Sequence, residues 1–153
     1  MVYEPRGRYW EEFVVGQAFE TTRRTVEAAD VLAFAGLSGD FNPLHIDAEF
    51  ARTGPFSERI GHGLLTLAIS SGQQNLLGLF EGTALAFLGM DRVRFTGPVR
   101  FGDTIHTEFT VKEARESSKP DRGVVTFEVT VKNHKGESVL TYDATVLLRR
   151  RRA

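Results

Sequence analysis

The sequence has no cysteine, almost no net charge and no apolar run long enough to cross a bilayer. The lack of cysteine excludes disulfides, thiolate metal sites and a cysteine nucleophile, and it is consistent with a cytoplasmic protein. A formal net charge of −1 gives no overall electrostatic reason to expect nucleic acid or an anionic membrane as a partner. No apolar stretch approaches the roughly 18 residues that a membrane span needs, and the first residues form no signal-peptide core. We therefore expect a cytoplasmic protein that binds neither nucleic acid nor membrane.

The length and composition indicate one folded domain over residues 1–153. The chain is 41% hydrophobic and 25% charged, which is close to the globular average and enough to bury a real core. Residues 1–10 are polar and aromatic and predict a loosely held N-terminal arm, in which Trp10 is a packing anchor. The arginines of residues 149–153 predict a solvated basic tail.

The first half of the chain mixes a strand with short helices. Residues 17–26 are rich in threonine and predict a strand. Residues 27–37 predict a helix with acidic residues in its first turn, which Ser38 and Gly39 end. Asp47 is placed to cap a further short helix that runs through residues 48–51.

A long helix is predicted to begin at the segment Ile60-Gly61-His62-Gly63 and to run to about Phe80. Apolar residues occupy nearly every side of it, which is typical of a buried helix. It is too short, and too polar over residues 73–75, to span a membrane.

The second half of the chain follows a period of two residues. The ranges 85–96, 104–115, 123–134 and 138–149 predict four long strands, and their short connections favour antiparallel pairing. Together with the first strand, they predict an α+β fold in which an antiparallel sheet of about five strands curls around a long buried central helix. The side chains expected on the packed face of the sheet are Phe87, Val93, Phe95, Phe101, Phe109, Val111, Phe127, Val129 and Val131.

The stretch from Ser38 to His45 concentrates an acid, an amide and an imidazole in a segment that its glycine and proline make irregular. The carboxyl group of Asp40 and the imidazole of His45 can act as acid and base if both reach one water molecule. A solvated loop, in which Asn42 forms an Asx-turn and the histidine is on the surface, is equally compatible with these residue types. His106 and His134 have no second ligand at metal spacing, so no metal site is predicted there.

The pattern Asp40-x-Asn42-Pro43-Leu44-His45, preceded by Ser38-Gly39 and followed by Ile60-Gly61-His62-Gly63, resembles the signature of the MaoC-like dehydratases, which include the R-specific enoyl-CoA hydratases. The likeness extends to the segments 8–16 and 98–104. It implies a hot-dog fold and the reversible addition of water to a trans-2-enoyl thioester, with an (R)-3-hydroxyacyl thioester as product.

The resemblance also implies roles for individual residues. Asp40 and His45 become the catalytic pair, and the backbone N–H of Gly63 becomes the donor to the thioester oxygen. Asn42 and, more weakly, Ser71 become supporting residues, whereas we expect His62 to be only a helix-start residue. No metal or redox cofactor is implied, because coenzyme A belongs to the substrate and hydration changes no overall oxidation state. The family also implies at least a homodimer, and a higher oligomer is compatible with it.

Three alternatives stay open beside the hydratase. One is a dehydratase whose acyl group is branched, dicarboxylic or bound to a carrier, because acyl choice depends on the shape of the tunnel. Another is a non-catalytic module that binds acyl thioesters, although such a module would be expected to lose Asp40, His45 or Gly63, and all three are present. The third is a thioesterase, in which water attacks the thioester carbon.

Overall fold

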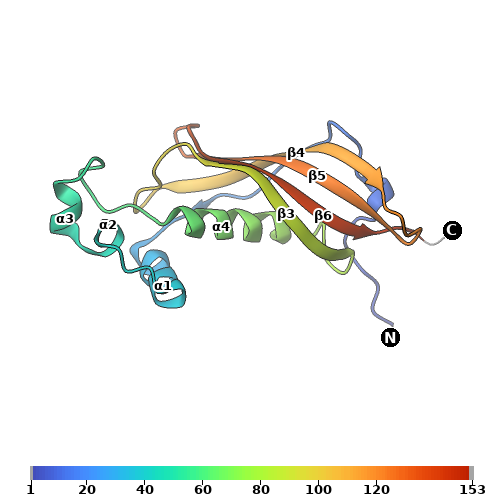
Figure 1. Cartoon of the computed structure of the whole chain (residues 1–153), viewed down its shortest axis with the longest axis horizontal. Helices are drawn as coiled ribbons and strands as arrows, with labels where there is room; N and C mark the ends of the chain where they lie inside the picture. The colour runs from blue at the N-terminus through green and yellow to red at the C-terminus, as the bar shows by residue number, and fades with distance from the viewer. Residues whose placement is uncertain (1, 152–153) are drawn as a thin grey trace.

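A computed structural model describes residues 2–151, and in it a curved antiparallel sheet wraps one side of a long helix (Figure 1). The sheet has six strands in the order β1-β4-β5-β6-β3, and the short β2 also pairs with β4. The helices α1, α2 and α3 are gathered near the N-terminal end of α4, and α2 and α3 extend past the sheet. The bounds of the strands are β1 Ala18–Glu20, β2 Arg24–Thr25, β3 Ala84–Phe95, β4 Thr104–Glu116, β5 Arg122–Asn133 and β6 Ser138–Arg149. The helices are η1 Trp10–Glu12, α1 Ala28–Ser38, α2 Pro43–Ile46, α3 Ala48–Arg52 and α4 Gly63–Leu76.

The hot-dog fold is confirmed, and the four long strands lie where the period of two residues predicted them. Strands β4, β5 and β6 pair antiparallel in sequence order, and β3 pairs with β6. Alternate residues of β5 turn inward, so that Val125, Phe127, Val129 and Val131 are fully buried. Together with Phe109, they form the part of the core that faces α4.

The expectation that Phe87 and Phe95 belong to the packed face is wrong for the single chain. Phe87 is 58% exposed and Phe95 is 51% exposed. Both lie on β3, which is the edge strand of the sheet, so only β6 flanks it. Val93 and Phe101 are partly buried against the core, as an intermediate case. The period of two residues identifies the side chains that share a face, but it does not show whether anything covers that face.

Helix α4 is buried along one side only, which corrects the expectation of burial all round. Leu65 and Ile69 are buried in the core. Leu64 and Leu76 are exposed, the latter at 81%, and they belong to a stripe of exposed residues along the helix at 64, 68, 71, 72, 75 and 76. The helix also ends at Leu76, four residues before the expected end, and residues 77–83 form turns.

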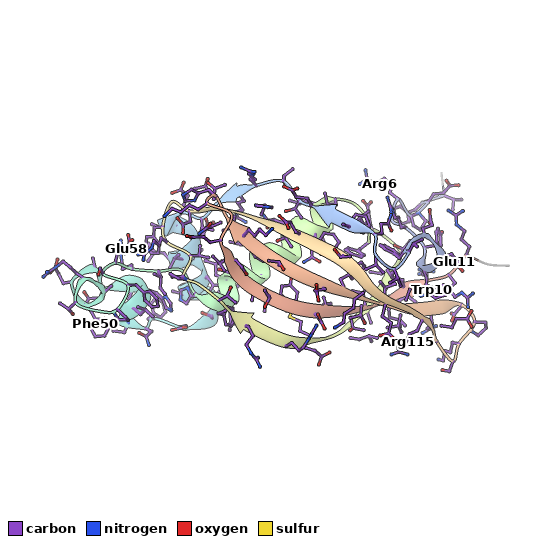
Figure 2. The ribbon with its side chains drawn as sticks, turned by 90° about the horizontal axis from the view of Figure 1, so that it is seen from above. Arg6, Trp10, Glu11, Phe50, Glu58 and Arg115 are labelled. Carbon is purple, nitrogen blue, oxygen red and sulfur yellow. The ribbon has the colours of Figure 1, made fainter. Side chains whose placement is uncertain are left out.

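The chain termini are held more firmly than the sequence suggested. The backbone N–H groups of Gly7 and Arg8 donate to the carbonyls of Glu81 and Leu79, and the indole N–H of Trp10 donates to Val124 at 3.2 Å. Trp10 therefore packs as predicted. Figure 2 shows it near Glu11 at one end of the molecule, with Phe50 and Glu58 at the other end.

The expected basic tail is also tied down over its described part. Arg149 is the last residue of β6. Arg150 forms ion pairs with Glu11 and Glu116, and Arg151 pairs with Glu12. The rest of the predicted tail, residues 152–153, lies outside the described residues. Over residues 2–151, no helix combines the length and apolar character that crossing a membrane requires.

Candidate active site

The approach to the site is a sharp reversal of the chain at the end of α1. Gly39 adopts a φ of +79°, and its N–H donates to the carbonyl of Ala35, which closes the helix. This left-handed conformation strains a residue that carries a Cβ, so glycine is required here for a local reason. The turn delivers Asp40 to the exposed segment just beyond the helix.

The sequence suggested an irregular segment after Asp40. The structure instead has the short helix α2 there. The side chain of Asn42 caps this helix, because its Oδ1 accepts the N–H of Leu44 at 3.1 Å. Pro43 occupies the first helical position, where its fixed φ fits and the missing N–H costs nothing. Asn42 thus forms the Asx-turn that its residue type indicated. Asp47 caps α3 as predicted by accepting the N–H of Phe50 at 3.0 Å.

His45 lies inside this short helix and is 8% exposed. Its Nδ1 is 2.7 Å from the carbonyl oxygen of Ile60. A carbonyl can only accept, so Nδ1 carries a hydrogen, and in the neutral imidazole Nε2 then has the lone pair. This is the protonation state in which an imidazole can take a proton from water. The surface histidine of the alternative interpretation is therefore not what the fold produces.

Asp40 keeps its carboxylate near this imidazole. One oxygen of Asp40 accepts the N–H of Asn42 at 3.2 Å, and the N–H of Asp40 donates to the hydroxyl of Ser38 at 3.2 Å. The potential ligand atoms of Asp40, His45 and His62 all lie within 4.8 Å of one another. The fold therefore brings together the acid and the base that the sequence singled out.

His62 is the site residue that the sequence analysis undervalued. It precedes α4 at the N-cap position and is 2% exposed. Its ring stacks on that of His45, with 3.8 Å between ring centroids, and its Nε2 is 2.9 Å from the backbone carbonyl oxygen of Asp40. The sequence placed His62 correctly at the start of the helix, but no local pattern reveals a contact across 17 residues.

The same three side chains form a group at metal-binding spacing, although the sequence predicted no metal. One nitrogen of each ring already faces a carbonyl oxygen. The two ring planes are only 29° apart, so the in-plane lone pairs of the two histidines lie in nearly parallel planes. A tetrahedral ion needs ligands that converge on one point. The arrangement therefore suits proton transfer better than coordination.

Gly63 begins α4 beside His45 and lines a cavity of about 540 Å³ with it. The first hydrogen bond of the helix runs from the N–H of Thr66 to the carbonyl of His62, so the N–H of Gly63 precedes the bonding of the helix itself. The ring of Phe95 closes over this glycine, because a Cβ built on Gly63 would lie 2.7 Å from its Cε1 atom. A side chain at residue 63 would therefore have to displace the ring of Phe95.

Ser71 is not gathered with the other predicted residues within one chain. It lies eight residues beyond Gly63 on α4, about 12 Å along the helix axis, and it lines a separate cavity of about 160 Å³. Its neighbour Ser70 is the buried serine, and Ser70 shares a hydrogen bond of 2.8 Å with the hydroxyl of Tyr142. Burial raises the pKa of Tyr142, and hydrogen bonds with Ser70 and Gln74 offset only part of the rise. Tyr142 therefore stays protonated as a structural link between α4 and the sheet.

Comparison with known sequences gives a match to one protein family. Residues 12–133 match the MaoC like domain. The chain is 38% identical over 135 residues to the (R)-specific enoyl-CoA hydratase of Aeromonas caviae, covering 88% of this chain and 94% of that one. It is 33% identical over 141 residues to the protein of the same name from Rhodospirillum rubrum, covering 92% of this chain and 91% of its relative.

Solved structures give the same result. A crystal structure described as a monoamine oxidase regulatory protein from Archaeoglobus superimposes with a TM-score of 0.90 at 38% identity, over 95% of this chain and 97% of that one. The likeness thus covers the sheet, the segment that carries Asp40 and the helices that carry His45 and Gly63.

Proposed function

The chain belongs to the MaoC-like domain family of acyl-thioester hydratases and dehydratases, and on this basis we propose that it adds water reversibly to trans-2-enoyl-CoA. The product is (R)-3-hydroxyacyl-CoA, the stereochemistry that the names of the relatives from A. caviae and R. rubrum carry. The observation that carries the proposal is the contact of the His45 Nδ1 with the carbonyl oxygen of Ile60, which leaves Nε2 for a water molecule beside the carboxyl group of Asp40.

The proposed reaction divides the two proton movements between this pair. One water molecule is held by Asp40 and His45. The Nε2 of His45 takes a proton from the water as its oxygen forms the bond to the β carbon of the enoyl group. Asp40, in its protonated form, supplies the proton that the α carbon gains and is left as a carboxylate. Transfer of the water-derived proton from His45 to Asp40 then restores both groups for the next turnover. In the reverse direction the two groups exchange roles, as microscopic reversibility demands.

Negative charge develops on the thioester oxygen during this addition. We assign its stabilisation to the N–H of Gly63, because the first N–H groups of a helix have no partner within the helix and the helix dipole favours an anion there. One such donor contributes roughly 3 kcal/mol in other oxyanion holes. Neither a metal nor a redox cofactor enters the proposal, since coenzyme A arrives with the substrate.

The proposed assembly is a homodimer. The exposed stripe of α4 includes Leu64 and Leu76, and Phe87 of β3 is also exposed, so both elements present apolar surface. Asp40 and Phe41 are also exposed in the single chain. A second copy placed over these residues would bury the apolar surface, protect the free edge of β3 and exclude bulk water from the acyl tunnel. A higher oligomer is compatible with this contact.

The test is an assay of crotonyl-CoA, which loses its conjugated-enoyl absorbance on hydration, followed by chiral analysis of the product. We expect the wild-type protein to bleach this band and to form the R product. Release of free thiol without hydration would instead indicate a thioesterase.

If crotonyl-CoA is not consumed, the same assay with longer, branched, dicarboxylic and carrier-bound enoyl thioesters tests the alternative substrate classes. A folded dimer that is inactive on the whole panel would contradict the proposal and favour a non-catalytic module that binds thioesters.

A further inference from the structure

His62 contacts both members of the proposed acid–base pair without itself facing the cavity at Gly63. Its ring stacks on the ring of His45, and its Nε2 reaches the main chain of Asp40. We propose that His62 is a positioning residue, which holds Asp40 through one hydrogen bond and supports the ring of His45 by contact. The inference rests on the proposed function for its effect on turnover, whereas its effect on the loop can be measured independently.

The hydrogen bond between His62 and Asp40 joins two separate segments of the site. The Nε2 of His62 lies 2.9 Å from a carbonyl oxygen, so this nitrogen carries the hydrogen and donates it. In its other hydrogen bonds Asp40 donates its N–H to Ser38 and accepts the N–H of Asn42, and both partners belong to the same short segment. The bond from His62 is therefore the one that joins Asp40 to the start of α4, where Gly63 lies.

Contact with His62 also limits the movement of the His45 ring. Its bond from Nδ1 to Ile60 fixes one edge of the imidazole but leaves the ring free to rotate about that contact. The ring of His62, at a centroid distance of 3.8 Å, limits this rotation from one face. His62 is itself held by Phe34 of α1, at a centroid distance of 5.0 Å. A chain of three rings therefore sets the direction of the Nε2 lone pair of His45.

A histidine at position 62 is unfavourable for the stability of the fold. Among residues 2–151, the buried Nδ1 of His62 meets no hydrogen-bond partner. Unpaired buried polar atoms are rare in folded proteins and are unfavourable for stability. A phenylalanine would fill a similar shape without this penalty, so packing alone does not explain the residue. The hydrogen bond from the His62 side chain to the backbone carbonyl of Asp40 supplies the reason.

The two imidazoles are thereby fixed in opposite tautomers. His45 carries its hydrogen on Nδ1, and His62 carries its hydrogen on Nε2. His62 cannot act as the base, because its free nitrogen is buried and unpartnered. Of these two histidines, only His45 therefore has a lone pair that a water molecule can reach.

The experiment compares two substitutions of His62, one that keeps the hydrogen-bond donor and one that keeps the ring. His62→Gln keeps an amide N–H at the position of Nε2, and His62→Phe keeps the ring but has no donor. We expect kcat for crotonyl-CoA hydration to stay within about threefold for His62→Gln and to fall about 10- to 100-fold for His62→Phe, because small misplacements of reacting groups are costly. We expect KM to change by less than about threefold in both variants, since His62 binds no part of the substrate.

The matched control is His106→Phe. His106 is also a buried histidine, but it lies on β4 and bonds to Glu108, away from the site. We expect it to change the melting temperature without lowering kcat by more than about twofold. An equal loss of kcat in His62→Gln and His62→Phe, or a change confined to KM, would overturn the inference.

Hydrogen exchange separates this inference from the proposed function. The amides of Leu44 and His45 bond to Asn42, and we expect them to exchange about 10-fold faster in His62→Phe but not in His62→Gln. Unchanged exchange in both variants would contradict the positioning role, even for an active enzyme. Faster exchange in His62→Phe would support it, even if the wild-type protein hydrates none of the thioesters.

Discussion

The Nδ1 of His45 lies 2.7 Å from the carbonyl oxygen of Ile60, fifteen residues further along the chain. Ile60 itself bridges to Arg100 beside β4, so the partner of this imidazole is fixed to the body of the fold. A single hydrogen bond thus decides both the tautomer and the direction of the proposed base.

Two substitutions at His45 separate the base from the hydrogen bond. In His45→Asn, an amide N–H replaces Nδ1 and can still donate to Ile60, whereas in His45→Gln the amide is displaced toward the position of Nε2. We expect kcat to fall by about 10² or more in both, because neither amide is a base. We also expect only His45→Gln to lose about 1–2 kcal/mol of unfolding free energy, since it leaves a buried carbonyl unpaired. Steady-state kinetics and urea titrations measure the two effects.

Asp40→Asn tests the acid in the same assay. The amide fills the same volume but cannot supply the proton, so we expect kcat to fall by about 10² or more. Because Asp40 is exposed, we expect little change in stability. A variant with full activity would remove Asp40 from the proposed mechanism.

Gly63→Ala tests the space reserved at the start of α4. The added Cβ would lie 2.7 Å from Cε1 of Phe95, but this ring is half exposed and can move aside. We therefore expect stability to change by less than about 1 kcal/mol, since alanine also favours the helix, while kcat/KM falls at least about 10-fold because the methyl group crowds the thioester. Adding Phe95→Leu relieves the clash with the ring and leaves the methyl group in the cavity. Recovery of full activity in the double variant would show that the displaced ring was responsible.

Phe87→Asp tests the proposed dimer. Phe87 is on the exposed face of β3, and a carboxylate buried there would oppose association. By light scattering after size exclusion, we expect the wild-type protein at twice the 17.1 kDa mass of one chain and the variant at the mass of one chain. Val15→Asp, at another exposed apolar residue, is the control and should remain a dimer. A wild-type monomer would contradict the proposed assembly, and a dimeric Phe87→Asp would place the contact elsewhere.

The lowered pKa of Asp143 predicts how the free energy of unfolding depends on pH. Burial by itself raises the pKa of Asp143, but hydrogen bonds from Lys112 and Arg92 and their positive charges lower it by more, so the net pKa is below the ordinary value. The stability that the carboxylate contributes is complete above the pKa of the unfolded chain, about 3.9, and is lost as the pH falls through the lower folded value.

We therefore expect Asp143→Asn to unfold more easily than wild type at pH 7, by about 2 kcal/mol, and the gap to narrow below pH 4. Urea titrations across this range measure it. Glu113→Gln, at an exposed position of β4, is the control, and we expect a change of no more than about 0.5 kcal/mol. A gap that persists undiminished at low pH would show that the charge of Asp143 is not its source.

The sheet was predictable because its signal is local. Each long strand begins and ends within about two residues of the predicted bounds, since alternation over twelve or thirteen residues and the turn residues between strands identify them. The motif from Asp40 to His45 was likewise recognisable, because its residues are consecutive. The short helix α2 was missed, because the proline that argues against a helix is favoured at its first position.

The errors arose where burial depends on parts of the chain that are distant in sequence. Phe87 and Phe95 have the right period, but they lie on the edge strand. Ser70 is buried and Ser71 is exposed, a difference of one residue in helix rotation that an apolar-rich helix does not reveal. The stacking of His62 on His45 depends on the path of residues 46–61, which no pattern in the sequence specifies.

The short helices α2 and α3 extend past the end of the sheet (Figure 1), and among residues 2–151 neither contributes a side chain to the main hydrophobic core. Regions with few core contacts open locally at a lower free energy than the whole molecule. The segment that carries His45 should therefore come apart while the sheet is still intact. On warming, the protein would lose turnover reversibly some degrees below its melting transition, so a thermal scan of the fold would overestimate the working range of the enzyme.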